Sequence, residues 1–93
     1  MPPGVRPYRR TPIFNESTMP AGLRREHRTQ VGVWALITVL DGQLWFRTFE
    51  PPRKAILTKG ETAAVAPEQV HEVEPNGSVQ FYIEFFRATD RSG

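Results

Sequence analysis

The distribution of apolar residues predicts a chain built from β-strands. The longest apolar run, residues 32–40, is rich in β-branched and aromatic side chains and lacks the spacing of an amphipathic helix. It leads into residues 41–42, Asp-Gly, a dipeptide suited to a tight hairpin turn, so residues 43–49 are predicted to form the return strand. Residues 79–87 alternate between two faces and are predicted to form the last long strand.

Shorter apolar segments predict the remaining strands. They lie at residues 54–57, 62–66 and 71–74, with weaker signals at 8–10 and 23–29, and a turn signal at 75–78. About seven to nine short antiparallel strands at this spacing indicate an all-β sandwich or barrel. We expect a single domain over residues 7–88, with residues 1–6 and 89–93 as loose ends.

The central apolar strand, residues 33–40, is apolar on both faces. A sandwich with one face in water does not require this pattern. One face would line the interior, and the other needs cover from the N-terminal segment or from a second subunit. Because a chain of 93 residues has a small core, we predict a homodimer.

Composition narrows the functional classes. There is no cysteine, which excludes disulfides, thiolate catalysis and cysteine-based metal sites. No apolar run approaches the roughly 20 residues of a membrane span, and the N-terminus lacks the apolar core of a signal peptide. We therefore expect a cytoplasmic protein that does not enter a membrane.

Positive charge is concentrated near the N-terminus. The net charge is +2, and residues 1–28 contain six arginines against two glutamates. The arginines lack interleaved glycines and aromatics and show no helical clustering, so this pattern favours a solvated basic surface over nucleic-acid binding.

The two histidines, His27 and His71, are the candidates with the clearest chemistry. Imidazole is the commonest protein metal ligand, and pairing of distant strands can bring two imidazoles together. The alternative interpretation is two ordinary, half-exposed histidines.

Two short motifs resemble those of the cupin family. Residues 39–42, Val-Leu-Asp-Gly, resemble the end of the first cupin motif, and His27 precedes that glycine by fifteen residues, near where the motif places its first histidine. Gly60, Pro67 and His71 are similar to the second motif. The usual His-x-His pair is reduced to one histidine, and apolar residues replace the glutamate expected before the first glycine.

A closer resemblance covers residues 8–87. Segments 20–22, 27–34, 36–42 and 70–75 are similar to a cupin-like family of small bacterial domains. One branch of that family forms the N-terminal domain of tellurite-resistance methyltransferases, and another stands alone. This chain has no room for a methyltransferase domain, so it resembles the stand-alone branch. The resemblance implies a small cupin-like jelly-roll β-barrel, in a branch whose biochemical activity is poorly defined.

The expected metal ligands are His27 and His71, with Glu74 or Glu84 as the third. In a regular strand Glu74 points away from His71, so it joins the site only if a bulge or the bend at Pro75 turns it inward. Two histidines, one carboxylate and an open position suit zinc, iron(II), nickel or manganese.

Other side chains are candidates for the ligand pocket. Arg25, close to the first histidine, is a candidate for holding an oxyanion, although solvated charge is its alternative role. The expected pocket wall is aromatic and consists of Trp34, Trp45, Phe46, Tyr82 and Phe86.

The leading hypothesis is therefore a cytoplasmic cupin-like domain that binds a metal, a small molecule or both, related by resemblance to tellurite and oxyanion resistance. Two alternatives stay open. One is a metal-dependent oxygenase or isomerase that uses both histidines and a glutamate as a facial triad. The other is a structural interaction module without a metal, because the fold alone does not set the function.

Overall fold

A computed structural model describes residues 1–88, and it confirms the predicted all-β fold. In this part of the chain, seven antiparallel strands belong to one sheet, and a short 3-10 helix precedes the third strand. The elements are β1 (Val5–Arg10), β2 (Phe14–Asn15), η1 (Ala21–Arg24), β3 (His27–Arg28), β4 (Val33–Phe49), β5 (Pro52–Leu57), β6 (Thr62–Val65) and β7 (Val70–Ala88).

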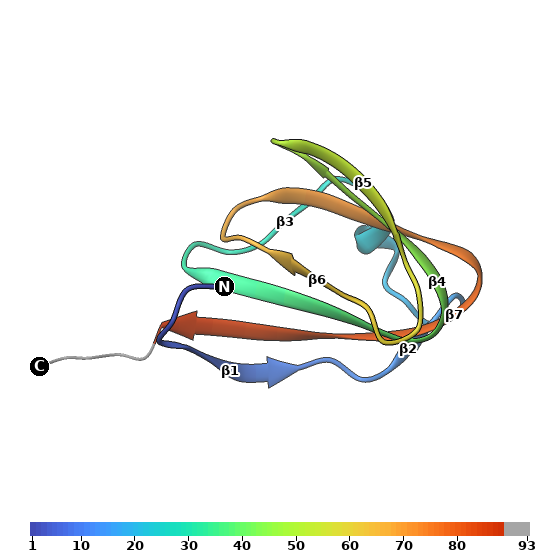
Figure 1. The fold of residues 1–93 in the computed structure, drawn as a ribbon, viewed down its shortest axis with the longest axis horizontal. Coiled ribbons are helices and arrows are strands. Elements are labelled where there is room, and N and C mark those ends of the chain that lie inside the picture. Colours follow the sequence, from blue (N-terminus) through green and yellow to red (C-terminus); the bar gives the residue numbers. More distant parts are fainter. Residues whose placement is uncertain (89–93) are drawn as a thin grey trace, which may run out of the picture.

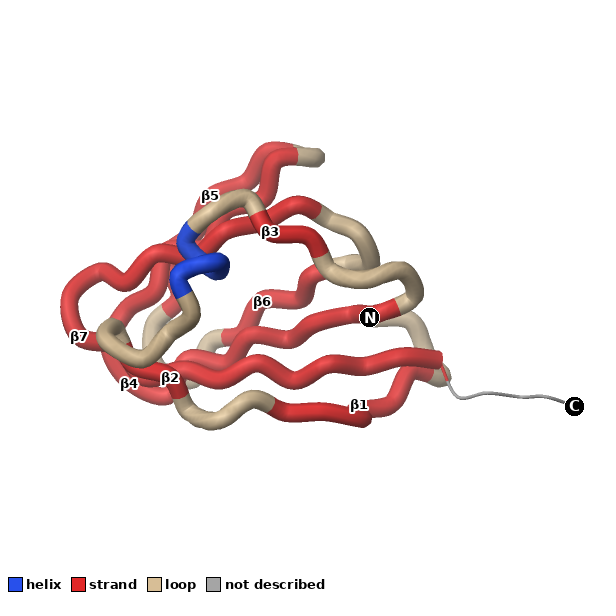
Figure 2. Tube along the Cα trace, turned by 180° about the vertical axis from the view of Figure 1, so that it is seen from behind, coloured by secondary structure: helices blue, strands red, loops and turns tan. Residues whose placement is uncertain are grey.

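The two longest strands, β4 and β7, form the frame of the fold. They pair with each other from Val33↔Arg87 to Thr48↔His71, and the register shifts on both sides of residues 41–42. At that point the sheet folds back over itself, as Figures 1 and 2 show. Each long strand therefore contributes one half to each of two layers.

The predicted hairpin at residues 41–42 is wrong, because β4 runs through this point without a return. Gly42 does have the positive φ of a turn residue, 78°, and Gly77 on the facing strand has 79°. A β-bulge uses the same backbone conformation as a turn. The two turn signals therefore mark one bend in a continuous pair of strands, where the Glu16 carboxylate accepts a hydrogen bond from the Val79 N–H at 3.0 Å.

The first layer contains β1 and β2, the C-terminal half of β7, the N-terminal half of β4, and β6. The second contains β3, the start of β7, the end of β4, and β5. Side chains from both layers meet in one apolar core, whose fully buried large members are Phe81, Ile37, Leu44, Val39, Val65 and Val79. The shared core makes the molecule a small two-layered barrel.

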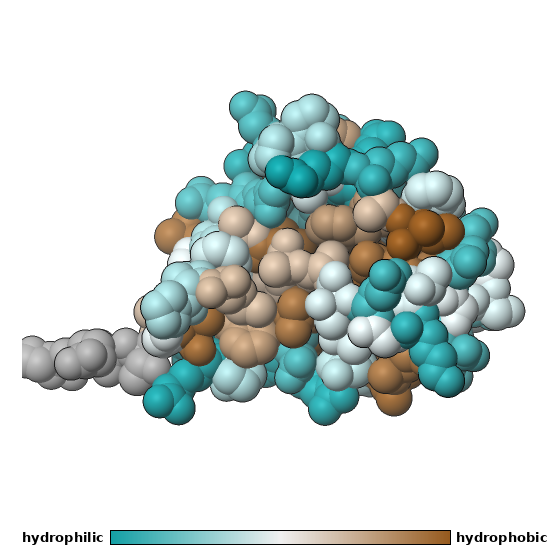
Figure 3. Space-filling view, in the orientation of Figure 1, coloured by the Kyte–Doolittle hydropathy of each residue, from teal (hydrophilic) through white to brown (hydrophobic). Residues whose placement is uncertain are grey.

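The outer face of the first layer is also partly apolar, as the sequence pattern predicts. Since Val33, Ala35, Ile37 and Val39 are buried, the intervening residues of β4 face outward. The half-buried side chains on this outer face are Trp34, Leu36, Tyr82 and Phe86. Apolar side chains gather over β4, β6 and β7 on the side of the molecule seen in Figure 3.

The chain ends differ slightly from the expected boundaries. β1 begins at Val5, two residues before the expected start of the domain, and pairs with the end of β7. Residues 89–93, which we expected to be a loose end, lie outside the described residues. Within residues 1–88, no helix has the length and apolar character needed to cross a membrane.

Candidate functional site

Strand pairing brings His27 and His71 together at the open end of the barrel, away from the bend. They are direct cross-strand partners on β3 and β7. Their ring centroids are 5.1 Å apart, and the rings meet edge to face at 75°. The two residues singled out by the sequence thus form one pair of imidazoles.

His71 is held as a neutral imidazole with a free nitrogen. Its Nδ1 lies 2.9 Å from the carbonyl oxygen of Gln69. A carbonyl only accepts hydrogen bonds, so Nδ1 carries the proton and Nε2 keeps its lone pair. Nε2 has no hydrogen-bond partner within residues 1–88 and still reaches solvent. Ligating imidazoles in metalloproteins usually donate their other N–H in this way.

The electrostatics of His71 favour the same state. Only 5% of the residue is exposed, and this burial lowers its pKa. The hydrogen bond to Gln69 opposes that effect, and the neighbouring His27 lowers the pKa further. His71 is therefore unprotonated at neutral pH, as metal binding requires.

A surface cleft of about 250 Å³ opens beside His27. It is lined by Tyr8, Arg9, His27, Arg28, Thr29, Gln30, Val33 and Phe85. The Arg9 guanidinium lies 5.8 Å from the centre of the Phe85 ring. The lining contains two arginines and no carboxylate, so this cleft beside His27 is positively charged.

Neither predicted glutamate ligand lies with the histidines. Glu74 is exposed and pairs with Trp45 on the outer face of the second layer. Glu84 is half-buried and pairs with Leu36 and Arg10 on the outer face of the first layer. Within residues 1–88, no group of three His, Cys, Asp or Glu side chains is placed to hold a metal ion.

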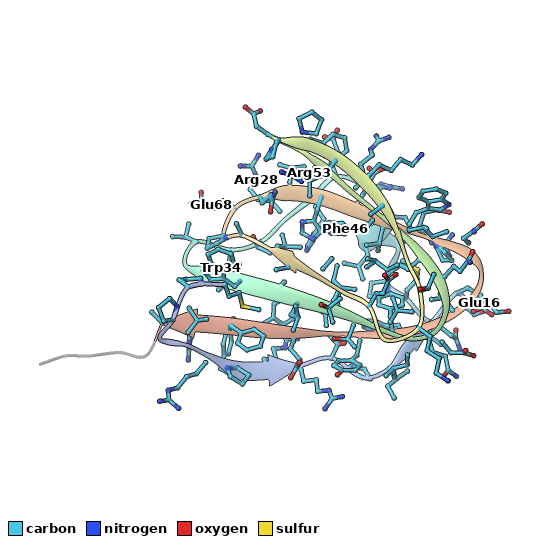
Figure 4. The ribbon with its side chains drawn as sticks, viewed as in Figure 1. Glu16, Arg28, Trp34, Phe46, Arg53 and Glu68 are labelled. Atoms are coloured by element: carbon cyan, nitrogen blue, oxygen red, sulfur yellow. The ribbon has the colours of Figure 1, made fainter. Side chains whose placement is uncertain are left out.

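The expected aromatic pocket wall is reduced to one residue. Phe46 is buried in the interior (Figure 4), with its ring centroid 6.4 Å from that of His71. Trp45 faces outward, where the Lys54 ammonium lies 4.7 Å from its ring centre. Trp34, Tyr82 and Phe86 lie on the outer face of the first layer, because they alternate with buried neighbours along their strands.

Arg25 also lies elsewhere than expected. It is exposed directly after η1 and does not line the cleft beside His27. Arg9 and Arg28 occupy that place instead. Sequence reasoning missed Arg9, Thr48 and Arg53, the last two of which continue the histidine row across β4 and β5.

The fold and the histidine pair define a small two-layered β-barrel with a candidate binding site at its open end. The chain belongs to the TehB-like domain family, whose model matches residues 9–83. This confirms the relation to tellurite-resistance methyltransferase domains that the sequence motifs indicate. The uncharacterized protein YeaR of Escherichia coli (strain K12) is 29% identical over 92 residues, covering 88% of this chain and 77% of YeaR.

Solved structures support the same family. A crystal structure of a protein from E. coli (strain K12) matches with a TM-score of 0.89 and 26% identity, covering 97% of both chains. TehB from Haemophilus influenzae matches with a TM-score of 0.84 and 26% identity, over 95% of this chain. The match spans 33% of the TehB chain.

Hydroxypropylphosphonic acid epoxidase from S. wedmorenis is a more distant neighbour. It has a TM-score of 0.60 and 18% identity, over 88% of this chain and 43% of the epoxidase. This likeness shows a shared fold alone.

Proposed function

We propose that this domain is a cytoplasmic binding domain for a small molecule, which it binds together with a divalent transition metal at His27 and His71. The observation that carries the proposal is the imidazole pair, in which His71 has its Nδ1 proton fixed and its Nε2 lone pair free. The family relation supports a role in tellurite or oxyanion resistance, which is part of the proposal.

The residues present fit a two-histidine centre. Zinc, iron(II), nickel and manganese are the candidate metals, and zinc, iron and nickel in particular suit imidazole. Because no third protein ligand is grouped with the pair in residues 1–88, the remaining coordination positions would belong to water or to the bound molecule. A metal held there would act as a Lewis acid toward that molecule.

Neighbouring folds suggest which metals to test first. Structures of the epoxidase HppE are described as iron(II) and cobalt(II) forms, the latter in complex with substrate. The oxygenase or isomerase alternative has less support, since its facial triad requires a carboxylate and both candidate glutamates face outward.

The test is metal content and metal affinity of protein purified without an affinity tag. Elemental analysis and calorimetric titration with zinc, and with iron(II) under anaerobic conditions, should show about one metal per chain. His27→Gln and His71→Gln should each remove most of the binding, whereas Glu74→Gln and Glu84→Gln should leave it unchanged.

Three outcomes would contradict parts of the proposal. If both histidine variants keep the metal content of the parent, the metal lies elsewhere. If the parent protein binds no metal, the metal part of this proposal is refuted and the metal-free alternative gains support. Loss of binding in Glu74→Gln or Glu84→Gln would restore the three-ligand site that the sequence predicts.

A further inference from the structure

Four residues form a continuous row across the inner face of the second layer. His27 on β3 pairs with His71 on β7, His71 pairs with Thr48 on β4, and Thr48 pairs with Arg53 on β5. Direct cross-strand partners project to the same face of a sheet. His71 and Thr48, in the middle of the row, are buried at 5% and 4% exposed, whereas His27 and Arg53 at its two ends are exposed to solvent.

Arg53 is placed to reach over Thr48 toward the histidines. Adjacent strands lie about 4.8 Å apart, so two strand spacings put the Arg53 and His71 backbones at ~10 Å from each other. An extended arginine side chain covers most of that distance. Thr48 and Arg53 line the same surface cleft, and the Thr48 hydroxyl donates to the Pro51 carbonyl at 2.7 Å.

Arg9 approaches the same site from the opposite edge of the barrel. It pairs with Phe85 on the inner face of the first layer and lines the cleft that contains His27. Neither Arg9 nor Arg53 forms an ion pair with any residue of the described chain. Arg28 is left out of the proposed anion site, because it also borders a cleft that holds Glu26, Glu50 and Glu68, whose carboxylates offset its positive charge. Figure 4 shows Arg28 and Arg53 over the same end of the second layer.

We propose that the ligand of this site is a small anion, a carboxylate or an oxyanion, and that Arg53 and Arg9 bind it beside the imidazole pair. This inference rests on the proposed binding site but not on the presence of the metal. A guanidinium matches two oxygens of such an anion with two parallel hydrogen bonds. Neither Arg9 nor Arg53 is paired with a carboxylate of the described residues, and a bound anion would supply that balance.

The charges also predict how anion and metal binding are coupled. Two guanidinium groups near the histidines repel a lone divalent cation. An anion that binds Arg53 and Arg9 would remove this repulsion, and its oxygens could serve as further ligands to a metal held by the two histidines. Anion and metal should therefore strengthen each other's binding by the same factor. A generally basic surface would bind anions without this coupling to the metal, so the coupling distinguishes a positioned anion site from such a surface.

The experiment titrates tag-free, metal-free protein with inorganic phosphate and with acetate at low ionic strength, following the His27 and His71 ring resonances by NMR. Arg53→Gln should weaken binding of the better anion about tenfold or more, since a charge-assisted bidentate contact is lost. Arg9→Gln should weaken it by a smaller factor. Lys54→Gln is the matched control, because this neighbour carries the same charge but faces outward over Trp45, and it should change the affinity less than twofold.

A second arm separates this proposal from that of the metal site. Arg53→Gln should bind zinc at least as tightly as the parent in the absence of phosphate, because a repelling charge is removed. His71→Gln should lose zinc and keep phosphate binding in the metal-free state. The anion proposal is overturned if neither anion shifts the histidine resonances, or if Arg53→Gln and Lys54→Gln weaken binding equally. A parent protein that binds phosphate but no zinc would refute the metal site alone.

Discussion

Replacing Gly42 by alanine should destabilise the fold much more than the same replacement at Gly77. The two glycines have nearly equal φ, 78° and 79°, a region that costs an L-residue about 1–2 kcal/mol. A Cβ at Gly42 would overlap the carbonyl oxygen of Ser78 and lie 2.9 Å from the Cα of Val79, whereas a Cβ at Gly77 meets nothing within 4 Å. The pair therefore shares the dihedral strain and differs only in the close approach of two strands.

The size of the loss of stability at Gly42 depends on which atoms a new Cβ would displace. The atoms that a methyl group at residue 42 would meet belong to the backbone of β7, so β4 and β7 must separate at the bend. Overpacking of this kind costs about 1–3 kcal/mol beyond the dihedral strain. We expect Gly77→Ala to lose roughly 1–2 kcal/mol and Gly42→Ala roughly 2–5 kcal/mol. In a domain of this size each kcal/mol lowers Tm by about 4–8 °C.

Urea denaturation followed by tryptophan fluorescence measures both losses, because Trp34 and Trp45 lie on either side of the bend in β4. Equal losses in the two variants would refute the idea that close strand contact at Gly42 defines the bend. Gly77→Ala is the control for the cost of positive φ alone.

The other predictions concern the site, a loop and the outer face. Burial lowers the pKa of His71 below its ordinary ~6.5, so the unfolded chain takes up a proton at a higher pH than the folded chain. The free energy of unfolding should therefore fall as the pH drops through about 6.5. Urea denaturation at several pH values should show a smaller fall in His71→Gln than in the parent. The Thr29 hydroxyl donates to a backbone carbonyl at 2.6 Å, so Thr29→Val should lose about 1 kcal/mol in thermal denaturation and Thr29→Ser much less. We also expect a homodimer through the outer face of the first layer. A second copy would cover the apolar side chains there, and Arg10 and Glu84 beside them would supply opposite charges to pair across the interface. Sedimentation should show a dimer that Trp34→Glu converts to the 10.6 kDa monomer; a parent chain that sediments as a monomer would contradict this.

Local patterning predicts the strands of this fold but not how they are joined. The alternation at residues 79–87 is enough to place Phe81 and Ile83 in the core, and the structure confirms it. The Asp-Gly signal at residues 41–42 correctly indicates a positive φ at Gly42. A hairpin turn and a bulge share that conformation, and the choice between them depends on the partner strand. Here the partner bends at the same place, so the chain continues where the local signal predicts a return.

The sequence predicts the candidate site only in part: residue chemistry identifies the histidines, whereas strand register sets which residues lie beside them. His27 and His71 stand out from the sequence by their chemistry, and the structure pairs them. Glu74 faces away from the histidines, because the alternation that buries Val73 places its neighbour on the outer face. Arg53 carries no local signal, because its place beside the histidines exists only through three successive strand pairings. Residue type thus indicates which groups can ligate, whereas register decides which charges lie beside them, and those charges are the basis for the anion that we propose as the ligand.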